Sequence, residues 1–200
     1  MIAPGIFRQY DVRGIFGAEL TVETARAIGR GFGELLDRRS LRGAVAVGRD
    51  NRPSGQVLQA ALIEGLVAGG RDVIDLGTVP TPVVYWSLHH LQVVGGIQVT
   101  GSHNPPEYNG FKLCVGTDSL HGDGIQQLRE LAAATWPTVV PGGRVQELDL
   151  LEGYAADILA KAGPVTRRLR VVFDCGNGTT SVVAGRLFGK LDIESHFLFC

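Results

Sequence analysis

Short apolar runs alternate with amphipathic segments along most of the 200-residue chain. Apolar side chains recur at helical spacing after Thr21 and again after Ser54, and both residues are placed to cap a helix. The apolar runs between these helices are typical of strands buried on both faces of a sheet. We expect helices at residues 21–38, 54–68 and 83–91, and strands at 44–48, 72–76 and 95–99. Alternating strands and helices predict parallel strands covered by helices.

The stretch Thr100–Gly110 interrupts this alternation, because it consists almost entirely of polar residues, glycine and proline. It is too short to carry the chain back for another parallel strand, which takes a dozen residues or more. We therefore expect Phe111–Val115 to lie antiparallel to an existing strand. A helix marked by Ile125 and Ala132 follows. The predicted fold class is α/β, with a mixed, mostly parallel sheet sandwiched by helices.

The hydrophobic pattern dissolves between residues 134 and 149, where Pro137 and Pro141 lie, and it resumes afterwards. We place a domain boundary there, dividing the chain into residues 1–148 and 149–200. The second part is expected to contain helices at 150–161 and 180–189, and strands at 169–173 and 193–199. Two strands in about 50 residues bury little core. Residues 149–200 are therefore predicted to be the incomplete start of a second, similar α/β domain.

Charge and composition narrow the choice of partners and of compartment. The formal net charge of −1 gives no reason to expect nucleic acid or an anionic membrane surface as a partner. No run approaches the roughly 18 apolar residues of a membrane helix, and the first residues lack a signal-peptide pattern. The three cysteines have no C-x-x-C spacing and are expected to be buried free thiols. A cytoplasmic protein is predicted.

The loop after residue 99 places a nucleophile, an imidazole, an amide and a cation close together, as Ser102, His103, Asn104 and Lys112. Taken alone, a serine in such a loop is a turn residue. A hydrolase nucleophile would lead directly into a helix, which Pro105–Pro106 prevents. Phosphoryl transfer through a phosphoserine fits better, because it needs an exposed hydroxyl, nearby cations and usually a divalent metal.

Residues 100–112 closely resemble the active-site loop of the α-D-phosphohexomutases, and within them the bacterial phosphomannomutase/phosphoglucomutase group. Four other segments resemble motifs of that family in the family's order. These are residues 7–14, 47–55, 79–82 and 171–178. The resemblance thus extends over the whole chain.

The resemblance implies a four-domain enzyme that moves a phosphoryl group between C1 and C6 of a hexose phosphate. Ser102 would carry the phosphoryl group, and a hexose 1,6-bisphosphate, derived from mannose or glucose, would be the intermediate. It also implies a magnesium ion (Mg2+) bound to the phosphate of Ser102 and to three aspartates. The isomerisation of mannose or glucose 1-phosphate to the 6-phosphate is the expected reaction.

The resemblance also implies roles for individual residues. Lys112 and Arg13 would lie against the reacting groups, with Lys112 a candidate for proton transfer. Tyr10 and Asn104 would join Arg13 and Lys112 in contacting substrate, and His103 would shape the loop.

Each of these roles has an alternative. Arg13 can instead pair with Asp11, and His103 can act as a general base or merely orient the loop. Arg49 and Asp50 are expected to lock a turn by pairing with each other. His89 and His90, on the helix at 83–91, are expected to be solvated or packed.

Several family motifs are absent from these residues. The magnesium loop, Asp-Gly-Asp-Gly-Asp-Arg, does not occur, nor do the sugar-specificity motif of the family's third domain and the phosphate-binding loop of its fourth domain. We therefore expect the N-terminal portion of a mutase, carrying the nucleophile and inactive by itself. The alternative is a non-catalytic, mutase-like binding or assembly module. Neither the sugar preference nor the oligomeric state follows from the sequence.

Overall fold

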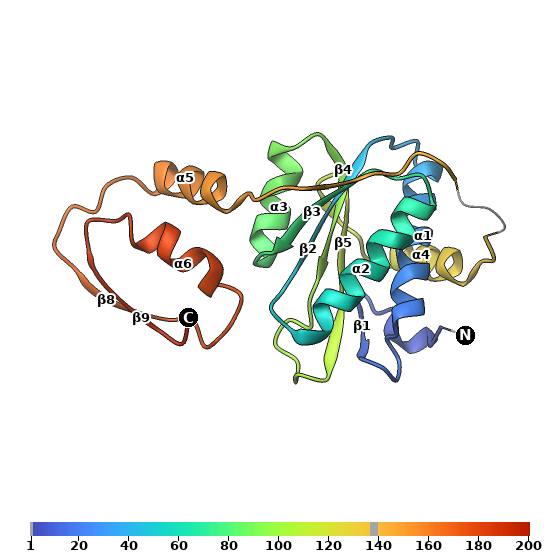
Figure 1. Ribbon diagram of the computed structural model, residues 1–200, viewed down its shortest axis with the longest axis horizontal. Helices are drawn as coiled ribbons and strands as arrows, with labels where there is room; N and C mark the ends of the chain where they lie inside the picture. The colour runs from blue at the N-terminus through green and yellow to red at the C-terminus, as the bar shows by residue number, and fades with distance from the viewer. Residues whose placement is uncertain (1, 137–139) are drawn as a thin grey trace.

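The computed structural model describes residues 2–136 and 140–200. It consists of a larger body, built on a central sheet, and a smaller lobe that extends from one side of it (Figure 1). The helices of the larger body are α1 (Val22–Arg38), α2 (Pro53–Ala68), α3 (Thr81–His90) and α4 (Asp123–Ala133), preceded by a 3-10 turn, η1 (Pro4–Ile6). Its strands are β1 (Val12–Ile15), β2 (Ala44–Arg49), β3 (Val73–Thr78), β4 (Val93–Val99), β5 (Tyr108–Val115), β6 (Asp118–Ser119) and β7 (Val145–Glu147).

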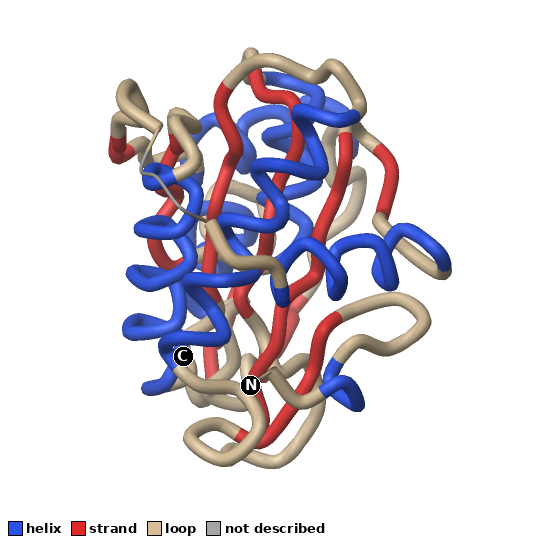
Figure 2. Tube along the Cα trace, turned by 90° about the vertical axis from the view of Figure 1, so that its right-hand side faces the viewer, coloured by secondary structure: helices blue, strands red, loops and turns tan. Residues whose placement is uncertain are grey.

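The central sheet is mixed and has the strand order β1-β5-β4-β2-β3-β7, with β6 paired to β5. Strands β2, β3, β4 and β7 pair in parallel, whereas β5 is antiparallel to both β4 and β1. Figure 2 shows the strands running side by side through the body. The predicted fold class and the antiparallel return after residue 110 are confirmed, because a loop that short leaves no room for a crossover helix.

Helices cover both faces of the sheet. Helix α1 packs against α2 and α4 on one face, while α3 lies against β2 and β4 on the other. The first cluster of buried hydrophobic residues, between α1, α2, α4 and the sheet, includes Phe32, Leu62 and Ile97, each fully buried. Thr21 caps α1 as expected, since its hydroxyl accepts a hydrogen bond from the Thr24 N–H (3.2 Å).

Two glycines set the close approach of α1 to α2. A Cβ atom on Gly29 would lie 2.1 Å from the Leu62 carbonyl oxygen, and one on Gly65 would lie 2.0 Å from that of Arg26. Glycine at these interior helix positions sacrifices helix propensity of about 1 kcal/mol each relative to alanine. The packing of the two backbones requires it.

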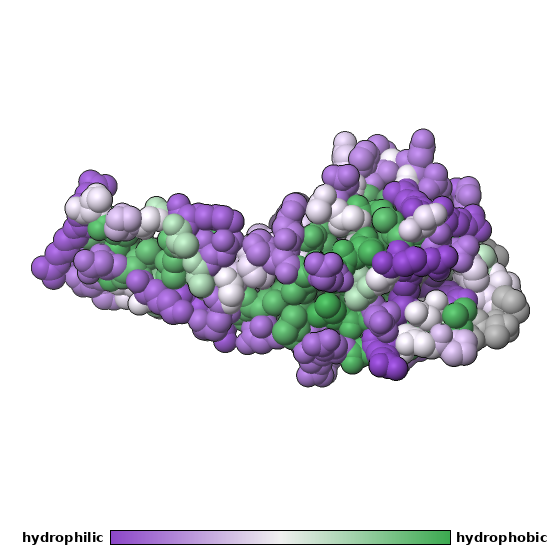
Figure 3. All heavy atoms as spheres, turned by 90° about the horizontal axis from the view of Figure 1, so that it is seen from above, coloured by the Kyte–Doolittle hydropathy of each residue, from purple (hydrophilic) through white to green (hydrophobic). Residues whose placement is uncertain are grey.

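The smaller lobe contains α5 (Leu151–Ala162), β8 (Arg170–Asp174), α6 (Ser181–Phe188) and β9 (Glu194–Leu198). Strands β8 and β9 pair in parallel as a separate two-stranded sheet. A second hydrophobic cluster joins this lobe to the body, because Leu151 and Val183 pack with Leu76, Val79 and Val83. Seen from above, hydrophobic residues reach the surface of both the body and the lobe (Figure 3).

Three local expectations need correction. Helix α2 begins at Pro53 with Arg52 as its N-cap, so Ser54 lies inside the first turn and caps nothing. The segment expected to be structureless adds strand β7 to the sheet, parallel to β3 (Pro137, in the same segment, lies outside the described residues). A three-residue strand, exposed along its length, carries too little hydrophobic signal to be recognised.

The third correction concerns the cysteines. All three are free, but only Cys114 is buried. Cys175 is half-buried, Cys200 is exposed, and their Sγ atoms lie 2.9 Å apart. Both cysteines follow the ends of the paired strands β8 and β9, and that pairing brings together residues 25 positions apart.

Candidate functional site

The candidate site lies at the carboxyl ends of β2 and β4, where successive strand connections pass over opposite faces of the sheet. From β2 the chain passes over one face through α2 to β3, and it returns over the other face through α3 to β4. The carboxyl ends of β2 and β4 are held together there by a hydrogen bond from the Asp50 N–H to the Val99 carbonyl (2.9 Å). Such a switch point in an open α/β sheet is a favoured place for ligands. The loop carrying Ser102 begins at this edge (yellow-green in Figure 1).

The backbone of this loop turns sharply at Ser102. Ser102 has a φ of 55°, in the left-handed region that residues other than glycine seldom adopt. Its N–H donates to the Thr100 hydroxyl oxygen (2.8 Å), and the Thr100 hydroxyl donates to a carboxylate oxygen of Asp50 (2.7 Å). The backbone N–H and the side-chain amide of Asn104 both donate to the Gly101 carbonyl, at 3.0 and 2.8 Å. These bonds leave the Ser102 side chain exposed.

His103 is the imidazole beside the candidate nucleophile. Its Nδ1 atom lies 3.3 Å from the Ser102 Oγ, at the long end of hydrogen-bond range. Both side chains are exposed. This geometry allows His103 either to act as a general base or to orient the loop, so both alternatives from the sequence stay open.

Arg52 extends from the turn after β2 into the interior of the loop. Its guanidinium donates to the carbonyl oxygens of Ser102 (3.2 Å), Asn104 (2.6 Å), Pro105 (2.7 Å) and Tyr108 (3.0 Å). The same side chain forms an ion pair with Asp50 (3.4 Å) and is 15% exposed. Asp50 was expected to pair with Arg49, but Arg49 reaches only its carbonyl oxygen, at 3.4 Å. The carboxylate instead joins Arg52 to the loop.

A cleft of about 670 Å3 opens beside the loop. It is lined by Ser102, His103 and Asn104, by residues 50–53 and 80–82, and by the turn 176–180 of the smaller lobe. Asn51 connects the two lobes, because its side-chain amide donates to the Asn177 carbonyl (2.7 Å) and its Oδ1 accepts from the Thr179 hydroxyl (3.2 Å). The body and the lobe therefore both contribute residues to the walls of this cleft.

Tyr10 and Lys112 line a different cleft, of about 370 Å3, together with Tyr85 and His121. Arg13 forms an ion pair with Asp11, the alternative that the sequence left open for it. Strand register nevertheless relates these residues, since Arg13 is opposite Gly110 and Lys112 is two positions further along β5. Their side chains therefore project from the same face of the sheet.

Sequence reasoning missed Arg52 and the buried Gln98. Gln98 is 1% exposed, and its amide donates to the Val79 carbonyl (2.9 Å). Gln98 is among the residues that line the Ser102 cleft, and its buried Oε1 has no hydrogen-bond partner among the described atoms. In the sequence, the one sign that Gln98 is unusual is its position as a polar residue inside an otherwise apolar predicted strand. His90, by contrast, is stacked on Trp86 with ring centroids 3.9 Å apart, so it is packed as expected.

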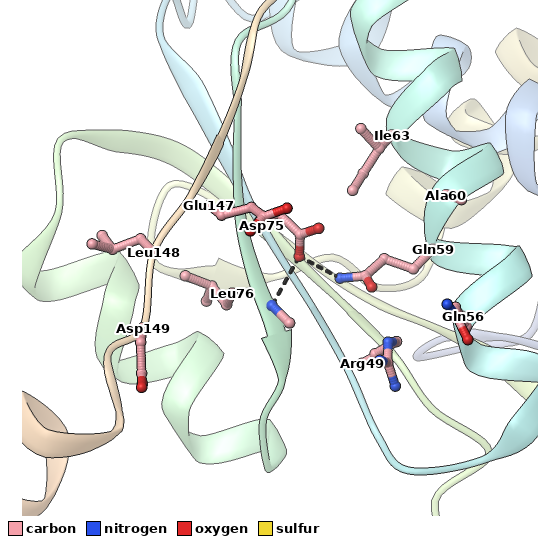
Figure 4. Close-up of a pocket in the computed structure, with 11 residues that line it drawn as sticks. Arg49, Gln56, Gln59, Ala60, Ile63, Asp75, Leu76, Glu147, Leu148 and Asp149 are labelled. Carbon is pink, nitrogen blue, oxygen red and sulfur yellow. Dashed lines mark hydrogen bonds between the residues drawn. The ribbon is translucent and has the colours of Figure 1, made fainter.

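Another cleft, of about 420 Å3, opens where α2 faces the ends of β2 and β3 (Figure 4). Asp75 points into it and accepts hydrogen bonds from the Gln59 amide and from the Gly77 N–H, each at 2.8 Å. Arg49 and Glu147 also line it. It contains carboxylates and amides but none of the nucleophilic residues of the Ser102 loop.

The donor set for the expected magnesium ion is incomplete. Across residues 2–136 and 140–200, no group of three or more histidine, cysteine or acidic side chains could hold a metal ion. The carboxylate nearest the loop, that of Asp50, is already occupied by Thr100, Gly101 and Arg52. Magnesium needs several oxygen ligands, so these residues alone do not fit it.

No helix in the described part of the chain has both the length and the apolar character needed to span a membrane.

Comparison with known proteins agrees with the resemblance. A family model described as "Phosphoglucomutase/phosphomannomutase, alpha/beta/alpha domain I" matches residues 4–133. The phosphomannomutase/phosphoglucomutase of Pseudomonas aeruginosa is 44% identical over 200 residues, covering 98% of this chain and 42% of its own length. The phosphoglucomutase of Neisseria gonorrhoeae is 36% identical, with 100% and 43% covered.

A solved structure shows the same relationship. The crystal structure of a phosphoglucomutase/phosphomannomutase family protein from Burkholderia thailandensis superimposes with a TM-score of 0.90 at 41% identity, covering 100% of this chain and 44% of that one. The chain thus spans about two fifths of the length of the relatives it matches. On the match to the family model and the agreement in structure, the chain belongs to the phosphoglucomutase/phosphomannomutase family.

Proposed function

We propose that this chain supplies the phosphoryl-carrying serine of a hexose phosphate mutase that interconverts the 1-phosphate and 6-phosphate of mannose or glucose. One observation carries the proposal above the others. Ser102 stands exposed on a strained turn at the switch point of the sheet, with its backbone fixed by Thr100. Strain of this kind at an exposed nucleophile is typical of sites where the side chain must be presented to a substrate.

In the proposed reaction, phosphoserine 102 donates its phosphoryl group to the free hydroxyl of a hexose monophosphate. The bond from phosphorus to the Ser102 Oγ breaks and a bond to the sugar oxygen forms; the sugar hydroxyl gives its proton to a base, and the departing Oγ takes up a proton to restore the serine hydroxyl. The resulting hexose 1,6-bisphosphate turns over and returns its other phosphoryl group to Ser102. His103, 3.3 Å from the Ser102 Oγ, and Lys112 are the candidates for proton transfer.

Arg13 and Lys112 are the proposed cations beside the reacting phosphoryl group. They share one face of the sheet, and a phosphoserine carries about −1.5 to −2 charges near neutral pH. Arg13 would have to exchange part of its pairing with Asp11 for a phosphate oxygen. Tyr10, which is 72% exposed, and Asn104 are the proposed substrate contacts.

We propose magnesium as the metal of the complete enzyme, where it would neutralise charge on the transferring phosphoryl group. Of the residues described, only Ser102 would be among its ligands, through the oxygens of its phosphate. We derive no step of the reaction through it.

A fused enzyme tests the proposal. Residues 1–200 of this chain would replace the matching 200 residues of the Pseudomonas aeruginosa relative, and conversion of mannose 1-phosphate to the 6-phosphate would be followed. We expect measurable turnover, phosphate on the peptide containing Ser102, and complete loss of both in Ser102→Ala. A Ser102→Ala enzyme with near wild-type turnover would overturn the proposal, as would a folded but inactive fusion. The 200-residue chain alone is expected to show no sustained turnover.

A further inference from the structure

We propose that Arg52 is a positioning residue, which holds the Ser102 loop in the conformation that presents the serine hydroxyl for phosphoryl transfer. This inference rests on the proposed function of Ser102. It assigns a role in that function to a side chain that does not itself contact the reacting atoms.

The contacts of Arg52 are concentrated on the loop backbone. Its Nη1 atom donates to Pro105 and Tyr108, and its Nη2 atom to Ser102 and Asn104, always to carbonyl oxygens and always within 3.2 Å. A charged donor makes stronger hydrogen bonds than a neutral one, and a planar guanidinium fixes the directions of all of them. One side chain thereby determines the course of the loop from residue 102 to residue 108.

The loop's own backbone satisfies these carbonyl oxygens only in part, because the Pro105 oxygen also accepts from the Tyr108 N–H (3.0 Å). Pro105 and Pro106 have no N–H, and the N–H groups of Ser102 and Asn104 are engaged with Thr100 and Gly101. Carbonyl oxygens that converge on one point need a donor there. Arg52 is that donor, and its removal would take a charged donor from all four carbonyls and leave Pro105 with its backbone bond from Tyr108.

The surroundings of the guanidinium are built to receive it. A Cβ atom on Gly101 would lie 2.5 Å from the Arg52 Cζ, so only glycine lets the loop pass this close. Asp50 balances the charge at 3.4 Å, and the same carboxylate accepts from the Thr100 hydroxyl and the Gly101 N–H. Arg52 and Asp50 together therefore hold both ends of the turn on which Ser102 sits.

The first arm of the test is kinetic and uses the fused enzyme. Arg52→Gln is expected to lower kcat by about 100-fold and to leave KM within about twofold, because a displaced nucleophile slows transfer while substrate contacts remain. Arg52→Lys keeps the charge but loses the planar fork, so it should restore little. Guanidinium ion added to Arg52→Ala should recover part of kcat. Arg38→Gln, at a surface ion pair with Glu34, is the matched control and should be unchanged.

The second arm does not depend on activity. In the 200-residue chain, amide hydrogen exchange at Ser102 and Asn104 should become at least about tenfold faster in Arg52→Gln and Arg52→Lys, with exchange in β2 and β4 unchanged. Because Arg52→Lys is the milder change, it decides the question if Arg52→Gln does not fold.

The outcomes separate the two proposals. If Ser102→Ala proves harmless while Arg52 variants still loosen the loop, the proposed function fails and the structural role of Arg52 stands alone, without one in catalysis. If Ser102→Ala is inactive but Arg52→Gln keeps kcat within about twofold and normal exchange at Ser102, the positioning role is wrong. A parallel rise in KM would also contradict it, since that result would mark Arg52 as a substrate contact.

Discussion

The larger body encloses a large, fully buried hydrophobic core, whereas the smaller lobe leaves much of its two-stranded sheet exposed. Phe32, Leu62 and Ile97 are 0% exposed in the body, but Val172 is 61% and Phe199 is 62% exposed in the lobe. The body encloses its core between helices on both faces of a sheet, and the lobe has only two strands with helices α5 and α6. A two-stranded sheet with one face uncovered has little independent stability.

The difference shows which part of the molecule can hold the Ser102 loop in a fixed conformation. The Ser102 loop is anchored entirely on the body, through Asp50, Arg52 and Thr100. The lobe contacts the body near this loop through residues 176–180 and through the hydrophobic cluster that includes Val183, and further away through α5, where Asp157 accepts from the Trp86 indole N–H (2.8 Å). Body and lobe are therefore expected to respond very differently to similar substitutions.

The largest contrast is expected between two helix glycines. Gly65→Ala should lower the free energy of unfolding by about 3 kcal/mol, because the new Cβ would overlap the Arg26 carbonyl of α1. Gly185→Ala, on α6 with open space around it, should raise helix stability by up to about 1 kcal/mol. Urea denaturation of the two variants measures both. Equal losses from the two substitutions would contradict the close α1–α2 packing.

A smaller effect is expected at the contact between the lobes. Asn51→Ala removes the two side-chain hydrogen bonds, to the Asn177 carbonyl and from the Thr179 hydroxyl, but keeps the bond from its backbone N–H to that hydroxyl (3.3 Å); it should cost about 1 kcal/mol of lobe docking. Amide exchange in β8, β9 and α6 should then rise about fivefold, while β2 and β4 stay protected.

Thr179→Val should reproduce about half of the increase caused by Asn51→Ala, and Thr117→Val, at an exposed turn, none of it. An increase spread evenly over both lobes would instead mean that Asn51 stabilises the turn after β2 and not the contact between the lobes.

The smallest effect concerns thiol reactivity, which leaves the fold unchanged. Burial raises the pKa of Cys114 in the body. In the lobe, the hydrogen bond between Cys175 and Cys200 raises the pKa of Cys175 to about 11. Since the thiolate is the reactive form, a raised pKa slows alkylation at pH 8. We expect iodoacetamide to modify Cys200 first, then Cys175 and last Cys114, as followed by peptide mass spectrometry.

Two changes sharpen the measurement at Cys175. Its alkylation should accelerate about tenfold per pH unit until the pH nears 11, and Cys200→Ala should accelerate it at pH 8 by returning the pKa toward its ordinary range. Unchanged reactivity of Cys175 in Cys200→Ala would show that the neighbouring sulfur does not raise the pKa of Cys175.

Much of this fold could be predicted from patterns that are local in the sequence. The helical spacing after Thr21, the apolar run at residues 44–48 and the short breaker-rich loop before Phe111 each determine an element or a strand direction. Strand β7 could not be predicted, because its three residues are exposed and its partner β3 lies about 70 positions earlier. Pairing energy, rather than side-chain pattern, creates that strand.

The sequence by itself determined the Ser102 loop, since serine, histidine, asparagine and two prolines follow a buried strand within a few residues. Only the tertiary structure decided how that loop is held. Arg52 is 50 residues from Ser102, and the hydrogen bonds between them form because parallel pairing brings the ends of β2 and β4 side by side. The same holds for the lobe, whose Asn177 and Thr179 reach Asn51 across more than 120 residues. Contacts of that range depend on topology, and no local pattern of residues encodes them.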